Sequence, residues 1–197
     1  MNLAIFGGTF DPIHAGHVEA VISAADALAI DKVLVIPSGN PPHKSRTDQA
    51  AYEHRYRMVE LACSADERLT PSRLEEPGAD GQRHYSYDTI QNVRRQFNFD
   101  EPLRFIIGGD AFAEIHLWHR WQEVGSEVAF VVVDRPGSHT DEAVLLADAR
   151  VERHAGPMNP ASSSEIRHRA KMGGTLADLA PAKVCDYIWE HRLYQLF

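Results

Sequence analysis

The residues best suited to chemistry lie in one stretch near the start of the chain, GGTFDPIHAGH at residues 7–17. The adjacent glycines Gly7 and Gly8 let a backbone approach an anion closely. The stretch follows a short apolar run and leads into a segment of helical periodicity, where the first turn of a helix offers free N–H groups and a partial positive charge. The pattern predicts a phosphate-binding turn between a strand and a helix.

His14 and His17 add two imidazoles to this turn. Residues three apart project from neighbouring positions of a helical turn, so both rings are expected to face the same way. An imidazole, neutral or protonated, can donate a hydrogen bond to a phosphoryl oxygen. We therefore expect both rings to point where a phosphate chain would lie.

Two other interpretations of this stretch are open. The dinucleotide fingerprint of dehydrogenases also places glycines after a first strand, but Gly7 and Gly8 are adjacent and no G-x-G-x-x-G is present. Two histidines three apart could hold zinc, with Asp11 as the nearby candidate for a further ligand, although zinc needs a third and usually a fourth ligand. Phosphate binding accounts for the glycines, the strand and the histidines together.

The elements that must position these residues alternate along the chain between short β-rich runs and helical patterns. This alternation is typical of a parallel sheet with helices on both faces, so we expect an α/β, Rossmann-like fold with right-handed βαβ crossovers. The expected strands are residues 3–6, 32–36, 69–73, 103–107 and 127–133.

The expected helices follow from apolar residues at helical spacing. They are about residues 15–29, a helix through Tyr52, Tyr56, Val59 and Cys63, a helix through Ile90, Val93 and Phe97, and two helices from Ser162 onward. We expect one domain over residues 1–197, with residues 162–197 as its small helical C-terminal part. Residues 37–49 and 75–83 are rich in proline and glycine and are expected to form long loops.

The composition limits the class of protein. The chain has 197 residues, 44% of them hydrophobic, which suits a single globular domain. Its formal charge of −8 excludes a positive charge spread over the whole chain that would bind nucleic acid. No apolar run approaches membrane-spanning length, and Cys63 and Cys185 have neither metal-ligand nor redox spacing. We expect a cytoplasmic protein without nucleic-acid or membrane partners, as a monomer or small homo-oligomer.

The stretch at residues 7–17 resembles the H-x-G-H signature of the nucleotidyltransferase superfamily, whose members transfer a nucleotide from an NTP and release pyrophosphate. Further segments resemble the bacterial nicotinate-nucleotide adenylyltransferases, in the same order along nearly the whole chain: PSGNPPHK at 37–44, IGGD at 107–110 followed by Trp118, and SSSEIR at 162–167. The resemblance implies that ATP and nicotinate mononucleotide are the substrates and that deamido-NAD and pyrophosphate are the products. Alternatives are an adenylyltransferase for nicotinamide mononucleotide or phosphopantetheine, and a nucleotide-binding sensor without turnover.

The resemblance also implies which residues act, and it gives catalytic roles to His14, His17 and Arg167. The ATP site would consist of Gly7, Gly8, Thr9, Phe10, His14, His17, Gly108, Asp110, Ser163 and Arg167. The mononucleotide site would consist of Asn40, Lys44, Ser86, Trp118 and His119. Mg²⁺ is expected as a cofactor held mainly by the ATP phosphates, with no protein ligand assigned.

Several of these residues have a structural alternative. Ser162 and Glu165 form the S-x-x-E pattern of a capping box, after which Ser163 would still face outward and Arg167 would lie one turn along, near the triphosphate. Asp110 could accept from a ribose hydroxyl or orient a metal-bound water, or could simply be a helix N-cap. Trp118 could stack on a flat ring or belong to the core.

The sequence departs from the family pattern at three positions. His84 stands in a segment where many members have Ser-Tyr-Thr, Ser164 replaces a threonine, and His119 follows Trp118 where tyrosine is common. Ser164 keeps the hydroxyl, whereas the two histidines are expected to change the shape of the pyridine pocket. Asp88 is expected to point into the first turn of its helix and satisfy backbone donors.

Overall fold

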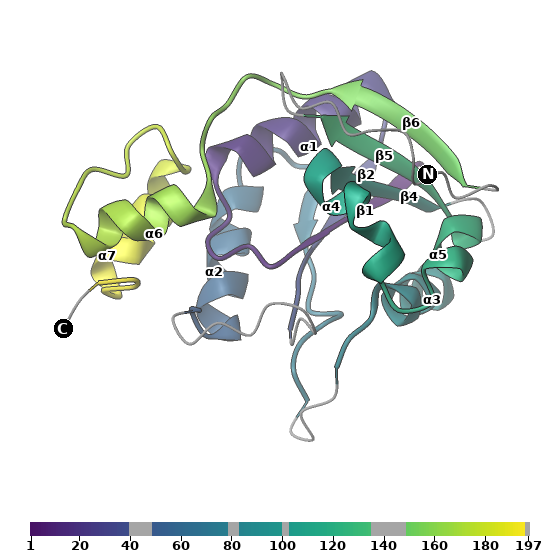
Figure 1. Cartoon of the computed structure of the whole chain (residues 1–197), viewed down its shortest axis with the longest axis horizontal. Coiled ribbons are helices and arrows are strands. Elements are labelled where there is room, and N and C mark those ends of the chain that lie inside the picture. Colours follow the sequence, from purple (N-terminus) through teal and green to yellow (C-terminus); the bar gives the residue numbers. More distant parts are fainter. Residues whose placement is uncertain (40–48, 79–82, 100–102, 135–148, 196–197) are drawn as a thin grey trace.

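A computed structural model describes residues 1–39, 49–78, 83–99, 103–134 and 149–195. Its centre is a six-stranded sheet in the order β3-β2-β1-β4-β5-β6, with every neighbouring pair parallel (Figure 1). The strands are β1 (Leu3–Gly8), β2 (Lys32–Pro37), β3 (Leu69–Pro71), β4 (Leu103–Gly108), β5 (Val128–Asp134) and β6 (Arg150–Ala155). The predicted α/β, Rossmann-like architecture is confirmed.

The helices connect these strands and follow the last one. They are α1 (Ala15–Ala27), α2 (Tyr52–Cys63), α3 (Ser86–Phe97), α4 (Gly109–Ala113), the 3₁₀ turn η1 (Ile115–Leu117), α5 (Trp121–Glu127), α6 (Ser163–Lys171) and α7 (Ala182–Glu190). Each helix predicted from apolar spacing is present. The segment of α4, η1 and α5 has no long apolar period, and the spacing alone did not predict it.

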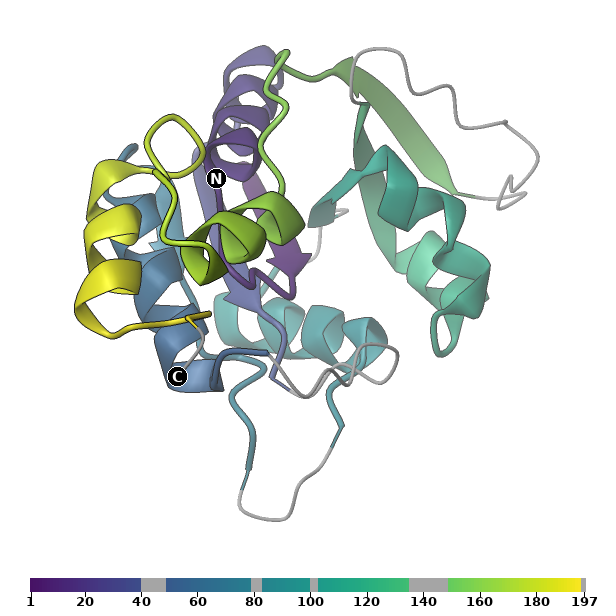
Figure 2. The same ribbon diagram turned by 60° about the vertical axis from the view of Figure 1, so that its left-hand side comes forward.

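The sheet is buried on both faces because its strands are apolar at successive positions. Ala4 and Phe6 of β1 face a core shared with α1, α2, α6 and α7, while Leu3 and Ile5 face a second core shared with α3, α4 and α5. Figure 2 shows α6 and α7 beside α2, on the side of the molecule opposite to α5. The C-terminal helices therefore share one core with the sheet, through residues such as Ile166.

The strand order places a topological switch point at β1. From β1 the chain builds β2 and β3 on one side of it and then returns to build β4, β5 and β6 on the other. The turns that leave the carboxyl ends of β1 and β4 therefore diverge, and ligands of such sheets bind in the crevice between them. Gly8 ends β1 and Gly108 ends β4, so the predicted ATP residues lie at this edge.

β6 was not predicted, and the predicted strand boundaries differ from the observed ones by one or two residues. β6 is an edge strand whose residues are mostly exposed and charged, including Arg150, Glu152 and Arg153, so it lacks the apolar pattern of a buried strand. Glu127 ends α5 instead of beginning β5, and β3 stops at Pro71. Within the described ranges, no helix is both long and apolar enough to cross a membrane.

Candidate active site

The turn after β1 ends in two histidines that cap each other. His14 is the N-cap residue of α1, in extended conformation, and its Nδ1 accepts a hydrogen bond from the backbone N–H of His17 at 3.3 Å. The Nδ1 of His17 accepts from the N–H of His14, also at 3.3 Å. The arrangement is a capping box in which ring nitrogens replace the usual side-chain oxygens. It explains why α1 begins at Ala15.

Reciprocal capping determines which ring nitrogen carries the hydrogen. Because both Nδ1 atoms accept, each neutral imidazole of His14 and His17 has its hydrogen on Nε2. The two rings are stacked with centroids 3.6 Å apart, so they lie side by side as the spacing predicts. Their Nε2–H donors belong to the start of a helix, where the backbone dipole favours negative charge. This pair is suited to bind phosphoryl oxygens.

Small and apolar residues support the two rings. A Cβ added to Gly16 would lie 3.2 Å from the Nδ1 of His14, so the glycine of the H-x-G-H motif leaves room for that ring. Phe10 is buried, and its ring meets the ring of His17 edge-on at 5.2 Å. Its φ of 47° is rare for a bulky residue, and a Cβ on Gly8 would come within 2.8 Å of its ring. The Phe10 side chain therefore supports His17 from the core.

Helix α6 packs its first turn against the same turn of chain. Ser162 caps α6 by accepting from the N–H of Glu165 at 3.2 Å, as predicted. The Glu165 carboxylate, however, accepts from Arg169 at 2.6 Å. The hydroxyl of Ser163 donates to the Pro12 carbonyl at 2.9 Å. The expectation that Ser163 faces outward is therefore wrong, because its hydroxyl satisfies a carbonyl of the turn that α6 covers.

Arg167 lies one turn further along α6, as the sequence predicts. Its Nη1 donates to the backbone carbonyl of Asp11 at 2.6 Å and lies 3.9 Å from Oδ2 of the Asp11 carboxylate. Ser163 and Arg167 thus hold Pro12 and Asp11, the two residues that precede Ile13 and His14. Histidines and arginine, distant in sequence, come from adjacent elements at one edge of the sheet.

The β4 side of the crevice begins at Gly108. Gly108 is the N-cap residue of α4, and a Cβ built on it would meet nothing within 4 Å, so open space lies beside it. Asp110 is exposed in the first turn of α4 and is not its N-cap, so the capping interpretation of Asp110 is wrong. An exposed carboxylate at this position can accept a hydroxyl or a metal-bound water.

Three of the residues predicted for the mononucleotide, Ser86, Trp118 and His119, come from two segments that touch. Trp118 is half-buried, and its ring packs against Phe105 of β4 with centroids 5.6 Å apart. His119 is exposed, with its ring 4.4 Å from the ring of Tyr85, which is the N-cap residue of α3. Ser86 is the first residue of α3, so Ser86 and His119 lie on neighbouring segments.

Three other expectations for this side have different outcomes. Asn40 and Lys44 lie outside the described residues, so their assignment stays a prediction. Asp88 is exposed, and the start of α3 has no side-chain cap, so the expectation that Asp88 satisfies backbone donors is wrong. In this first turn of α3, the Tyr85 carbonyl accepts a hydrogen bond from the Thr89 hydroxyl at 3.2 Å.

Arg55, which was not predicted from the sequence, is a buried arginine beneath the site. Its Nη1 donates to the carbonyls of Thr9 at 2.7 Å and Ser38 at 2.8 Å, and its Nε donates to Ala50 at 3.1 Å. It thereby joins the turn after β1 to the turn after β2. Burial lowers the pKa of the guanidinium, and the Asp11 carboxylate opposes that effect. The sequence did carry a signal for Arg55, because this residue occupies a position on the face of α2 that otherwise holds apolar residues.

In the ranges that the structure describes, no group of three or more His, Cys, Asp or Glu side chains could hold a metal ion. The zinc interpretation of His14 and His17 therefore has no supporting ligand set there.

Known proteins resemble this chain over most of its length. Residues 5–169 match the family model described as "Cytidylyltransferase-like". A protein of Solibacter usitatus named "Probable nicotinate-nucleotide adenylyltransferase" is 50% identical over 98% of this chain and 100% of its own. The chain belongs to the nicotinate-nucleotide adenylyltransferase family. A Thermus thermophilus relative with the same name is 39% identical over 99% of this chain and 100% of its own.

The fold of this member of the nicotinate-nucleotide adenylyltransferase family also matches a solved structure. The Plasmodium falciparum nicotinic acid mononucleotide adenylyltransferase, described as complexed with NaAD, superposes with a TM-score of 0.79 and 22% identity, covering 98% of this chain and 97% of that one. Membership of the adenylyltransferase family contradicts the dehydrogenase interpretation of Gly7 and Gly8.

Proposed function

We propose that this chain transfers the adenylyl group of ATP to nicotinate mononucleotide, giving deamido-NAD and pyrophosphate in NAD biosynthesis. The observation that carries the proposal is the pair His14 and His17, whose Nδ1 atoms cap the start of α1 so that each Nε2 carries a hydrogen, in a turn whose Asp11 carbonyl binds Arg167. The chain belongs to the nicotinate-nucleotide adenylyltransferase family. Relatives at 50% and 39% identity over the full chain carry that name.

The reaction joins two phosphates without a covalent enzyme intermediate. A phosphate oxygen of the mononucleotide attacks the α-phosphorus of ATP, and the bond from the α-phosphorus to the bridging oxygen of pyrophosphate breaks. The attacking oxygen is ionised at neutral pH, so no protein base is required. The protein positions the two substrates and neutralises the charge that gathers on the α-phosphoryl group and on the leaving pyrophosphate.

His14, His17 and Arg167 would supply that neutralisation. The imidazole pair donates from Nε2 without a change of protonation, and Arg167 adds a full positive charge. Gly7, Gly8 and the backbone of Thr9 and Phe10 would let the triphosphate lie against the turn, which the Ser163 hydroxyl supports by donating to the Pro12 carbonyl. Gly108 and Asp110 would lie on the ribose side. These groups are aimed at charge that grows in the transition state, which is where binding energy accelerates a reaction.

Mg²⁺ would enter with ATP, held mainly by the phosphates, with the exposed Asp110 carboxylate as the protein group suited to a metal-bound water. When bound, the ion would stabilise negative charge on the phosphoryl oxygens. We also propose that the protein works in the cytoplasm. The proposal is supported by Cys63 and Cys185, the two cysteines of the sequence, which are both free thiols.

The mononucleotide would bind on the other side of the transfer point. Lys44 supplies a point charge for its phosphate, and Trp118 offers a ring face to the pyridine. Donors for the pyridine carboxylate would be Asn40, the Ser86 hydroxyl and backbone N–H groups at the start of α3, where the helix dipole also favours an anion. His119 lies next to this start and would add a donor.

These donors predict a preference for the acid over the amide. Two charge-assisted hydrogen bonds, at roughly 1.5–3 kcal/mol each, would favour nicotinate over nicotinamide mononucleotide by about two to four orders of magnitude in kcat/KM.

The test is pyrophosphate release with ATP, Mg²⁺ and each of three acceptors in parallel: nicotinate mononucleotide, nicotinamide mononucleotide and phosphopantetheine. We expect turnover with the first acceptor and kcat/KM at least about a hundredfold lower with the second. Comparable values for the two mononucleotides would refute the acid assignment while leaving adenylyl transfer intact. Turnover only with phosphopantetheine would reassign the acceptor. ATP binding without pyrophosphate release from any acceptor would favour the sensor.

A further inference from the structure

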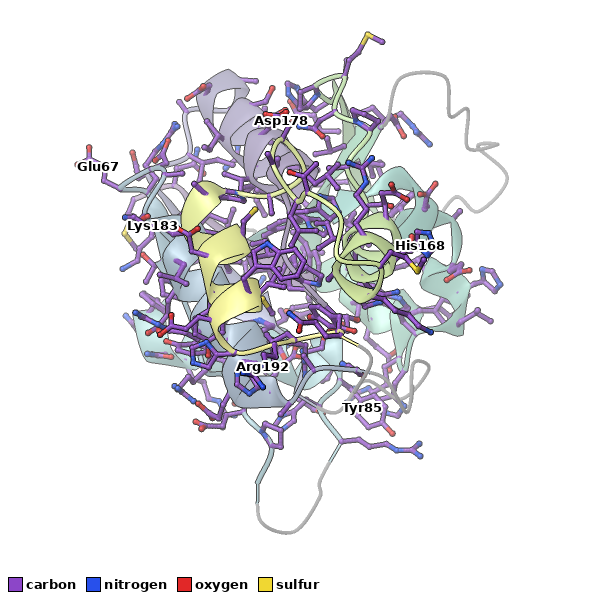
Figure 3. All side chains as sticks on the ribbon, turned by 90° about the vertical axis from the view of Figure 1, so that its left-hand side faces the viewer. Glu67, Tyr85, His168, Asp178, Lys183 and Arg192 are labelled. Carbon is purple, nitrogen blue, oxygen red and sulfur yellow. The ribbon has the colours of Figure 1, made fainter. Side chains whose placement is uncertain are left out.

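The chain returns to the active-site turn close to its C-terminal end. After α7, the residues up to 195 leave the helix near Arg192, and Figure 3 shows this segment crossing from the end of α7 toward α6, which carries His168. Tyr194 lies in this segment and packs against the core that α6 and α7 share with the sheet. Its hydroxyl donates to Oδ1 of Asp11 at 2.8 Å, across 183 residues of sequence. The C-terminal segment thus reaches the turn that carries His14.

The Asp11 carboxylate accepts hydrogen bonds from more than one segment. Asp11 is 5% exposed, and its Oδ1 also accepts from the backbone N–H of Ala50 at 3.1 Å. Burial raises the pKa of the Tyr194 hydroxyl, and the nearby Asp11 carboxylate raises it further, so the phenol stays protonated and acts as the donor. One carboxylate therefore holds three segments together: the turn after β1, the start of α2, and the C-terminal segment.

Arg167 meets the same residue in an asymmetric way. Its Nη1 is 2.6 Å from the Asp11 backbone carbonyl but 3.9 Å from the nearer carboxylate oxygen, Oδ2. A guanidinium beside a buried carboxylate ordinarily forms a close, bidentate pair, because that geometry satisfies both charges. Here the Tyr194 hydroxyl and the Ala50 N–H already occupy Oδ1, so the carboxylate is turned away from a two-oxygen pairing with Arg167.

We propose that Tyr194 is a positioning residue for adenylyl transfer: its hydroxyl holds Oδ1 of Asp11 and thereby prevents Arg167 from closing onto the carboxylate, which leaves the guanidinium charge available to the triphosphate of ATP. The inference rests on the proposed function and adds a residue that touches no substrate. Without the hydroxyl, the Asp11 carboxylate turns toward Arg167 and the two form a bidentate pair. The guanidinium charge is then neutralised by Asp11 and no longer stabilises the leaving pyrophosphate.

The test compares two tyrosine variants that each lose one hydroxyl. Tyr194→Phe keeps the ring that packs against the core. Tyr187→Phe is the matched control, since the Tyr187 hydroxyl also makes one hydrogen bond to a side chain, the Nδ1 of His54 at 3.0 Å, away from Asp11. Both variants are expected to fold, with melting temperatures within about 5 °C of wild type. Tyr194→Phe is expected to lower kcat by about tenfold or more and to weaken ATP binding, with KM for the mononucleotide unchanged.

A double-mutant cycle separates positioning from simple stability. In an Arg167→Ala background, Tyr194→Phe should cause no further loss of kcat, because the charge that it misplaces is already absent. Equal losses in the two backgrounds would overturn the inference, as would a Tyr194→Phe enzyme that matches Tyr187→Phe in kcat and in ATP affinity measured by calorimetry. If wild type releases no pyrophosphate with any acceptor, the proposed function fails, and the calorimetric comparison of the two tyrosine variants with ATP alone still decides the role of Tyr194.

Discussion

The imidazole of His14 lies over the imidazole of His17 with 25° between the ring planes, and each residue binds the backbone N–H of the other through Nδ1. The same two atoms therefore begin helix α1 and orient the Nε2–H groups proposed to bind ATP. His14 and His17 thus have a structural role, as caps of α1, and a proposed role in ATP binding, so substitutions must be chosen that separate these two roles.

His17→Ala is expected to lower kcat by about a hundredfold or more, because the lost donor faces charge that develops in the transition state. His17 is half-buried and its ring caps the N–H of His14, so loss of this cap should lower the free energy of unfolding by about 1 kcal/mol. Steady-state kinetics and urea unfolding of the same preparation measure both quantities. Near-normal kcat in a folded His17→Ala protein would remove the proposed role.

His14 needs a different control, because it is 2% exposed and caps α1. His14→Ala should lower kcat like His17→Ala and also destabilise the fold by at least about 1 kcal/mol through the lost cap. His14→Asn keeps a capping side chain and removes Nε2. It should recover much of the stability and none of the activity. Recovery of activity by Asn would show that His14 acts only as a cap.

Arg167→Ala and Lys44→Ala should affect different substrates. Arg167 lies on α6 beside the turn that carries the histidines, so its loss should weaken binding of ATP and of the transition state. Lys44 is assigned to the mononucleotide, so its loss should chiefly raise the KM for that substrate. Calorimetric titration with ATP is the sharper measurement. Equal loss of ATP affinity in both variants would contradict the assignment.

Arg55→Lys should loosen both substrate turns at once. Lysine keeps the charge but cannot donate simultaneously to the carbonyls of Thr9, Ser38 and Ala50, so buried acceptors lose their partners. We expect unfolding free energy to fall by roughly 2–3 kcal/mol and KM to rise for both substrates.

Arg57→Lys is the control for that change, because Arg57 lies on the exposed face of the same helix and pairs with Glu60. It should alter stability by no more than about 0.5 kcal/mol. A change in KM for one substrate alone after Arg55→Lys would mean that Arg55 supports a single turn.

Glu75 should make stability depend on pH. Burial raises the pKa of this carboxyl, although the Thr89 hydroxyl, 2.8 Å from Oε1, and the charge of His84 act in the opposite direction. The folded state therefore keeps a proton that the unfolded chain has lost, so this contribution to stability is complete below pH 4.5 and falls as pH rises through the folded pKa.

Glu75→Gln should remove that slope. Unfolding free energies across pH 4 to 8 should show the variant gaining on wild type as pH rises. Glu76→Gln, which changes the exposed neighbouring carboxyl, is the control and should not show the same trend. A constant difference between Glu75→Gln and wild type at all pH values would exclude Glu75 as the source.

The parts of the fold that could be predicted are those whose evidence is local. β1, β2, β4 and β5 are buried on both faces, so each appears in the sequence as an apolar run, and the boundaries fell within one or two residues. The cap made by Ser162 and the shared face of His14 and His17 follow from spacing alone. β6 could not be predicted, because an exposed edge strand needs no apolar residues.

The contacts that organise the site were beyond local evidence. Arg55 reaches Thr9 across 46 residues, and Tyr194 reaches Asp11 across 183. Periodicity shows that Arg55 faces inward but does not identify the carbonyls that it binds. The same limit explains why Ser163 was wrongly expected to face outward. Its hydroxyl donates to the Pro12 carbonyl, and this partner is brought close only when α6 packs on the turn.

The two edges of the sheet have a consequence for any assembly of this chain. β3 is three residues long and ends in Pro71, which has no N–H to offer a further strand, and β6 carries Arg150, Glu152 and Arg153 in exposed positions. Neither edge is a good template for a strand of another molecule, so sheets of separate copies do not readily join into one.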